Sequence, residues 1–203
     1  MGGTMSSITI NGDTSGSVIL NAPAIAGSTT LTLPTTTGTL VTSNAMPTGS
    51  VLQVVQTVKT DTFSTAVQSY TDVTGLSASI TPSKTSSKIL VLLNVYCSIS
   101  AAAVAGYVTV LRGSTNLITS NGSRTPTTIS LEGSTGAGMQ YTGVQASMSY
   151  LDSPSTTSST TYKVQAMTNT GAGLIYINRN ANDSNTYQYA TSQSTLTLLE
   201  IAA

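Results

Sequence analysis

The 203-residue sequence has no histidine and no tryptophan, and it has only one phenylalanine and one cysteine. Histidine is the commonest general base and the commonest transition-metal ligand, so serine–histidine and cysteine–histidine catalysis are excluded. With Cys97 as the only thiol, a zinc site is effectively excluded as well. Cys97 cannot form a disulfide within one chain, and we expect it to be a small buried thiol within a strand.

Charge is also scarce. Only 7 % of the residues are charged, and seven Lys and Arg balance seven Asp and Glu. The basic residues are scattered singly, whereas nucleic-acid binding and adhesion to anionic membranes need them clustered. The longest apolar run, residues 89–95, is far shorter than the roughly 20 residues of a membrane helix. We therefore expect neither nucleic acid nor membrane insertion among the functions of the chain.

About a third of the residues are Ser or Thr, yet the mean hydropathy is +0.16. Disorder is typical of chains with low hydrophobicity or high net charge, and this chain has neither. A monomer with so little charge has little repulsion to keep it apart from its neighbours in solution. The composition therefore favours self-association.

The residue pattern predicts an all-β protein, because β-branched residues alternate with polar ones and Gly, Pro, Asn and Ser separate the runs. Residues 88–95 are apolar on both faces, so we expect a central strand covered on each side, whereas residues 76–80 alternate as a half-exposed strand does. The number of short strands is typical of a sandwich or jelly roll. They are expected at residues 51–58, 68–73, 76–80, 88–98, 107–112, 116–119, 127–131, 139–151, 161–167, 174–178 and 196–201.

Pro47 and Gly49 mark a boundary between an N-terminal β-arm, residues 1–45, and a C-terminal knob, residues 46–203. Strand-like pieces of the arm, residues 7–11, 17–22, 29–33 and 39–42, are too short to bury much. An isolated two-stranded ribbon is marginal in water, so the arm needs a partner. We expect copies of the arm to pair and to bury Val18, Leu20, Leu31, Leu33 and Leu40. The alternative is that the arm folds back as edge strands of its own sandwich.

The arm sequence "GSVILNAPAIAGSTTLTLPTTTGTL" resembles the short repeat of tailed-bacteriophage fibre proteins, especially those of phages of aquatic bacteria. The strings "PTGSVLQVVQ", "ITPSKTSSKILV", "LRGST", "LDSPSTTSSTTYKVQ" and "INRN" are similar to the C-terminal knobs that follow such repeats. The resemblance implies an intertwined homotrimer with a jelly-roll-like antiparallel β-sandwich knob. It also implies a virion location and a knob that meets a bacterial surface glycan or protein. Because the arm is short, a capsid decoration or head-fibre protein, anchored to other virion proteins by the arm, is the alternative.

The best candidate for ligand binding is the segment "NRNANDSNTYQY" at residues 178–189. Tyrosine offers a rigid apolar face with a polar tip, and asparagine offers paired donors and acceptors, a combination that suits sugars or varied protein surfaces. Alternatively, the two tyrosines pack between subunits or on a sheet face. One carboxylate among several asparagines is too few for a calcium site, so we predict no metal and no cofactor. The candidate ligand-binding residues are Asn178, Arg179, Asn182, Asp183, Asn185, Tyr187 and Tyr189.

A glycosidase needs only two carboxylates, and the chain has seven Asp and Glu. The turn contexts of Asp13 and Asp152 and the lack of tryptophan argue against a catalytic cleft. We therefore predict a non-enzymatic virion protein that works by adhesion. A polysaccharide-cleaving enzyme and a bacterial surface adhesin are the remaining alternatives.

Overall fold

The structure is a computed structural model that describes residues 7–21, 30, 32, 35–38, 41, 46–100, 103–132, 143–187, 189 and 191–203. It divides the chain into two compact units, Met1–Thr42 and Ser43–Ala203. The regular structure of the described residues is entirely β-strand, which confirms the all-β prediction. Among these residues there is no helix of the length and hydropathy needed to cross a bilayer.

The first unit contains an antiparallel hairpin of β1 (Ser7–Asn11) and β2 (Ser17–Asn21). Its turn is closed by the Gly12 N–H, which donates to the Gly16 carbonyl at 2.9 Å, and Gly16 has a φ of 79° that favours glycine. The strands predicted at residues 7–11 and 17–22 are confirmed over the described residues. The strands predicted at residues 29–33 and 39–42 lie mostly outside them, as do Leu31, Leu33 and Leu40.

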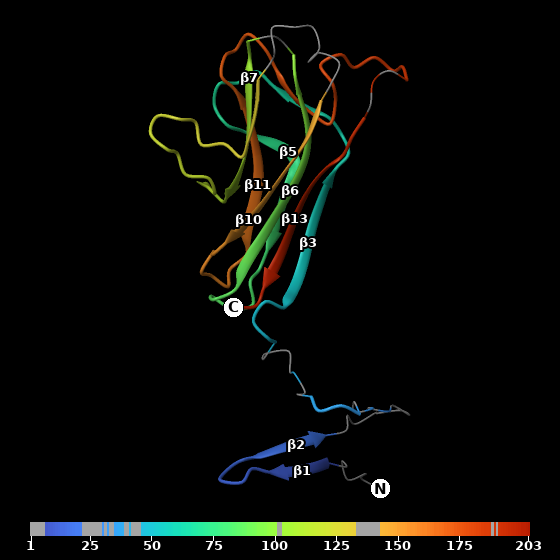
Figure 1. The fold of residues 1–203 in the computed structure, drawn as a ribbon, viewed down its shortest axis with the longest axis vertical. Coiled ribbons are helices and arrows are strands. Elements are labelled where there is room, and N and C mark those ends of the chain that lie inside the picture. Colours follow the sequence, from blue (N-terminus) through green and yellow to red (C-terminus); the bar gives the residue numbers. More distant parts are fainter. Residues whose placement is uncertain are drawn as a thin grey trace. The chain divides into compact units, whose positions relative to one another are not determined.

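The second unit is a sandwich of two antiparallel sheets (Figure 1). In the first sheet, β6 is central: β13 and β12 pair with one of its edges and β10 with the other, β3 pairs with β13, and β4 with β12. Its strands are β3 (Val51–Lys59), β4 (Phe63–Thr65), β6 (Lys88–Ile99), β10 (Val144–Asp152), β12 (Ile175–Ile177) and β13 (Ser194–Ile201).

In the second sheet, β11 lies between β5 and β7, and β7 also pairs with β8 and β9. Its strands are β5 (Thr71–Ile80), β7 (Ala105–Arg112), β8 (Thr115–Asn116), β9 (Ile129–Glu132) and β11 (Thr160–Thr168). The predicted antiparallel β-sandwich is therefore confirmed.

The core lies between the sheets and is built from alternate residues of each strand. The alternation predicted for residues 76–80 is confirmed in β5, because Leu76, Ala78 and Ile80 are buried while Ser77 and Ser79 are exposed, and β11 alternates in the same way. Cys97 is fully buried in this core, and burial raises the pKa of its thiol to about 12. The inward apolar sets include Leu76, Ala78, Ile80, Ile89, Val91, Leu93, Val95, Tyr162, Val164 and Ala166.

One prediction about β6 is confirmed and the other stays a prediction. The strand is central in its sheet, as expected, and within the described residues of the knob only one of its faces is covered. Leu90 and Leu92 point away from the second sheet and are half-buried between the neighbouring strands. The described part of the chain places no second layer over them, so the sandwich uses only half of the apolar surface that this strand offers.

Local backbone features explain the other differences in strand boundaries. The predicted strand at residues 68–73 begins only at Thr71, and it continues into the predicted strand at residues 76–80 as the single strand β5, because Gly75, at a φ of 78°, allows a bulge opposite β11. The predicted strand at residues 116–119 ends early, because the side chain of Asn116 accepts the Ile118 N–H and turns the chain. The short strand β4 was not predicted.

The sandwich has two distinct ends. At the first, which we call the proximal end, the chain enters the knob beside its own C-terminus: Gly49 N–H donates to the Ala202 carbonyl, and Ala202 N–H to the Ser50 carbonyl, both at 2.8 Å. From the opposite, distal end, β13 runs back from Ser194 beside Lys59 to Ile201 beside Val51. The segment that connects β12 to β13, residues 178–193, therefore lies at the distal end (Figure 1).

Candidate functional site

The candidate binding segment follows β12 directly and is held at its base by Asn178. The side chain of Asn178 is 1 % exposed, and its amide donates to the carbonyls of Lys59 at 2.8 Å and Asp61 at 2.9 Å. The Ser194 hydroxyl donates to the Asn178 amide oxygen at 2.6 Å. Asn178 also adopts a φ of 63°, a conformation that asparagine tolerates better than most residues. This residue anchors the loop and is not available to a ligand.

The base is reinforced by a buried cation at the end of β3. The Lys59 side chain is fully buried; its ammonium group lies 2.9 Å from the Asp61 carboxylate and donates to the Thr74 carbonyl at 2.8 Å. The hydrogen bond from Lys59 lowers the pKa of the exposed Asp61 carboxyl. A buried ammonium is costly unless it is paired and hydrogen-bonded, and these contacts meet both needs. They fix the distal end of β3 against β5 and against Asn178.

Arg179 is also occupied by contacts within the loop. Its guanidinium lies 4.5 Å from the ring centroid of Tyr176 and donates to the carbonyls of Asn180 and Ala181, both at 3.1 Å. Its Nε is 3.4 Å from the Asp183 carboxylate, so the two charges neutralise each other. The arginine stiffens the loop and leaves little net charge for a charged ligand.

The tip of the loop carries the accessible side chains. Tyr187 is 96 % exposed, Asp183 and Asn185 are exposed, and Asn182 and Tyr189 are half-buried. Residues 178–187 contain turns and bends and no strand, and the Tyr189 N–H donates to the Thr186 carbonyl at 3.2 Å. Of the predicted residues, the structure thus leaves Asp183, Asn185 and Tyr187 most open to a ligand.

Sequence reasoning missed two residues of the loop base. Lys59 is distant in sequence, and no motif marks it as a partner of Asn178. Asn180 is 4 % exposed and accepts a hydrogen bond from the Tyr96 hydroxyl of β6. The density of asparagines suggested ligand contacts, but two of them satisfy buried polar groups instead.

Five of the described carboxylates make structural contacts with other residues: Asp61, Asp72, Asp152, Asp183 and Glu200. Asp152 receives two hydrogen bonds from Arg112, each at 2.8 Å, and one from the Tyr162 hydroxyl at 2.6 Å. Asp152 is therefore a buried ion-pair residue and not the turn residue that was predicted. Among the residues that the structure describes, no three His, Cys, Asp or Glu side chains gather in a group that would hold a metal ion.

The hairpin of the first unit presents a different kind of surface. Cross-strand pairing places Ile8 beside Leu20 and Ile10 beside Val18 on one face, and all four side chains are exposed, Ile8 by 64 %. Val18 and Leu20 were predicted as arm contacts, whereas Ile8 and Ile10 were missed although the same alternation marks them. Within its own unit, this apolar face is not covered by the described residues.

Comparisons with known proteins give little further guidance. No family model and no curated protein matches the sequence. Two solved structures are similar in part: infectious bursal disease virus Gx strain, with a TM-score of 0.36 and 16 % identity, and a VP2 subviral particle of infectious bursal disease virus, with 0.33 and 18 %. Each match covers 74 % of this chain, which spans 36 % and 37 % of the respective chains. Scores this low do not place the chain in a family.

Proposed function

We propose that this chain is a structural component of a bacteriophage virion, a non-enzymatic fibre protein whose knob binds the host surface. The observation that carries the proposal is that the two ends of the knob differ in what they hold. The segment that leads in from the first unit and the C-terminus share the proximal end, whereas the candidate binding loop lies at the distal end (Figure 1). A fibre needs this arrangement, because its attachment and its contact surface must face opposite ways.

The loop suits weak contact with a neutral, polar surface such as a glycan. Its base is fixed by Asn178 and Arg179, so little ordering remains to be done on binding. Its tip presents the Tyr187 ring and the Asn185 amide to solvent. So few side chains give one copy only a low affinity for a glycan. Three linked copies in a homotrimer would bind the host surface more tightly through avidity.

Binding to whole cells tests the proposal. Fluorescently labelled full-length protein is expected to bind some strains of a bacterial panel, and Tyr187→Ala is expected to reduce binding about tenfold, which corresponds to about 1.4 kcal/mol for each contact. Asn185→Ala is expected to have a smaller effect in the same direction. Asn121→Ala changes an exposed asparagine of another loop and serves as the matched control, because it should bind normally.

Two outcomes would contradict adhesion by the loop. If Tyr187→Ala and the Asn121→Ala control bound bacteria equally well, the loop tip would not be the binding site. Glycan turnover that disappears when one carboxylate is replaced would show an enzyme instead of an adhesin. Imaging of intact particles would decide the virion location, because density for the chain is expected to project from the particle.

A capsid decoration protein is the second candidate, and the open hairpin face favours it. Ile8, Ile10, Val18 and Leu20 offer an apolar strip that a shell protein could cover. In that case Ile10→Asp is expected to abolish attachment to capsids while binding to bacteria is absent in every variant. In a fibre that trimerises through its arm, the same variant is expected to weaken self-association.

A further inference from the structure

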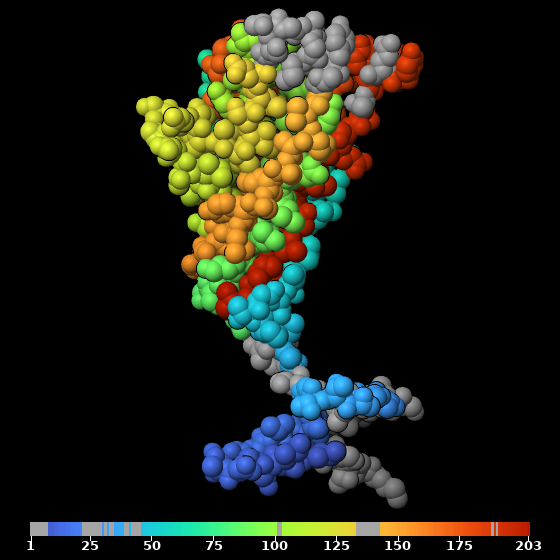
Figure 2. Space-filling view, viewed as in Figure 1, coloured from blue at the N-terminus to red at the C-terminus, as the bar shows by residue number. Residues whose placement is uncertain are grey.

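The outer face of the first sheet is a broad surface with almost no charge. The strands β10, β6, β13 and β3 lie side by side on it, and Figure 2 shows their four bands at the surface of the knob. Apart from Lys88 at the proximal edge, the outward residues of these strands are uncharged. They are Val51, Val54, Gln56, Val58, Leu90, Leu92, Asn94, Tyr96, Gln145, Ser147, Ser149, Leu151, Thr195, Thr197, Leu199 and Ile201.

Strand register arranges the apolar side chains of this face in a row. Val54 pairs with Leu199, Leu199 with Leu90, and Leu90 with Leu151, so one apolar residue from each strand lines up across the sheet. Val54 is 59 % exposed and Leu151 is 56 % exposed. A continuous apolar row of this kind on a soluble domain is typical of a contact surface.

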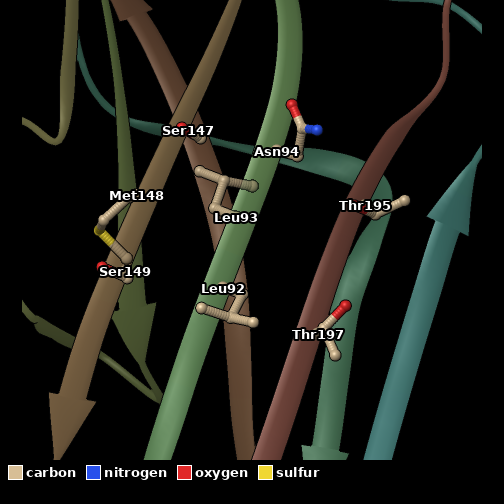
Figure 3. A pocket seen from close by; sticks show the side chains of 8 residues that line it. All are labelled: Leu92, Leu93, Asn94, Ser147, Met148, Ser149, Thr195 and Thr197. Carbon is tan, nitrogen blue, oxygen red and sulfur yellow. The ribbon is translucent and has the colours of Figure 1, made fainter.

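A depression lies beside the row. Leu92 sits at its floor between Ser147 and Ser149 on β10 and Thr195 and Thr197 on β13, as Figure 3 shows. These flanking side chains are small, whereas Val54 and Leu151 at the two ends of the row are larger and more than half exposed. The face therefore combines an apolar row with a shallow depression. A second copy of the chain would present the same two features.

The outer face of the second sheet is partly covered by another segment of the same chain. Residues 113–128 lie against β7: the Thr109 hydroxyl donates to Asn116, and Tyr70 and Asn116 both donate to the Pro126 carbonyl. The rest of that face carries the ion pair of Lys163 with Asp72 at 2.9 Å. One outer face is thus partly covered and charged, whereas the described residues of the knob leave the other uncovered and nearly neutral.

The β3 edge of the first sheet is bridged to the second sheet by side chains. Gln53 donates to the Thr81 carbonyl and Thr57 to the Ser77 carbonyl, both at 2.7 Å, so side chains of β3 bridge to β5 along this edge. Side-chain bridges of this kind protect an edge strand from pairing with another chain. The β3 edge is therefore not the surface through which copies of the knob would associate.

We infer that the outer face of β10, β6, β13 and β3 is the surface through which the knobs of this chain pack against one another. A partner for this face must be flat and uncharged and must offer apolar residues in a row beside small polar ones. A second copy has all of these properties, and the near absence of charge removes the repulsion that would keep copies apart. Only the expected number of copies, three, rests on the proposed function.

Distances between spin labels on the full-length chain test the inference. Ser149→Cys places a nitroxide label on the face, and Ser77→Cys places one on the outer side of the second sheet; both positions are exposed and the native Cys97 is buried. Position 149 lies on the inferred contact and position 77 on the far side of the sandwich, so the inter-copy distance at position 149 is expected to be shorter than that at position 77 by at least the spacing of stacked sheets, about 10 Å.

The double substitution Val54→Lys and Leu151→Lys is expected to remove the short distance at position 149, because it brings like charges together in the contact. Both side chains are more than half exposed in the single chain, so the variant should keep the fold of the knob, which circular dichroism would show. Val67→Lys, at an exposed valine between β4 and β5, is the matched control and should retain the short distance.

Three results would overturn the inference: a distance at position 149 that equals or exceeds that at position 77, a distance that survives the double substitution, or no inter-copy distance at all. These results are separable from failure of the proposed function. A protein that binds no bacterium and occupies no virion would still give the short distance, and a dimer would contradict the trimer but keep the face.

Discussion

The hairpin and the knob contain the same kinds of apolar residues in the same alternation, yet burial differs completely between them. In the knob, Leu93 and Val91 are at most 1 % exposed because a second sheet lies over them. In the hairpin, Ile8 and Val18 are more than 60 % exposed. The difference teaches that alternation specifies a strand, whereas burial requires a second layer, which a single ribbon cannot supply.

The largest expected contrast comes from truncating one apolar side chain in each region. Leu93→Ala should lower the free energy of unfolding of the knob by about 4 kcal/mol, because it removes packed atoms and leaves a cavity. Ile10→Ala in the hairpin should leave knob unfolding unchanged. Urea unfolding followed by circular dichroism measures both, and equal effects would remove the distinction between the regions.

A second contrast concerns charge. Asp152→Ala should cost about 3 kcal/mol, because it strips a buried partner from Arg112 and Tyr162. Asp13→Ala, in the exposed turn of the hairpin, should change the stability of the knob by less than about 0.5 kcal/mol. The same unfolding experiment compares them. If Asp152→Ala left the free energy of unfolding unchanged, the ion pair and its hydrogen bonds would contribute nothing to the stability of the knob.

A third contrast compares two positions with positive φ. Asn178→Ala should cost the knob about 2 kcal/mol through lost hydrogen bonds and backbone strain, and Asn178→Gly should cost less because glycine relieves the strain. Gly16→Ala strains the hairpin turn, but it should not shift the unfolding of the knob. If alanine and glycine at position 178 behave alike, strain contributes nothing there.

The smallest effect is expected from acid titration of Glu200. Burial alone would raise the pKa of this carboxyl, but hydrogen bonds from Ser83 and Gln53 outweigh it and lower the pKa below its ordinary value of 4.5. A lowered pKa stabilises the folded state above about pH 4.5, and this contribution is lost as the pH falls through the folded value.

The Glu200 contribution is measured as the free energy of unfolding at pH values from 7 to 3. The natural protein should lose stability below pH 4.5 more steeply than Glu200→Gln, which cannot titrate at this position. The hairpin lacks a buried carboxylate among its described residues, so its turn should show no comparable dependence. If the free energy of unfolding of the natural protein and of Glu200→Gln fell in parallel with pH, groups other than Glu200 would cause the acid sensitivity.

Much of the knob could be predicted from the sequence because its strands are strongly periodic. Residues 161–167 alternate so regularly that the position and the two faces of the strand follow from the pattern, whereas for residues 88–98 the apolar run gives the position of the strand but not its inward face. The break at Gly75 was misjudged because glycine marks both a turn and a bulge, and only the pairing with β11 distinguishes them. The short strand β4 has too few residues for any period to be seen.

The candidate loop shows the complementary limit. Its density of Asn and Tyr pointed to the distal segment, and Tyr187 is indeed almost fully exposed. The roles of Asn178 and Asn180 were beyond sequence reasoning, because their partners Lys59 and Tyr96 are more than 80 residues away along the chain. Asparagine has the same chemistry in a ligand site and in a structural network.

The sequence by itself determined that this protein is built of antiparallel strands, since side-chain alternation is a property of each segment alone. The sequence also sets the low number of charges, so charge repulsion does little to keep copies of the chain apart. Only the tertiary structure decided which apolar faces are covered. The second sheet covers one face of β6, and no described element of the knob covers the other, because burial depends on the element that packs across from a strand.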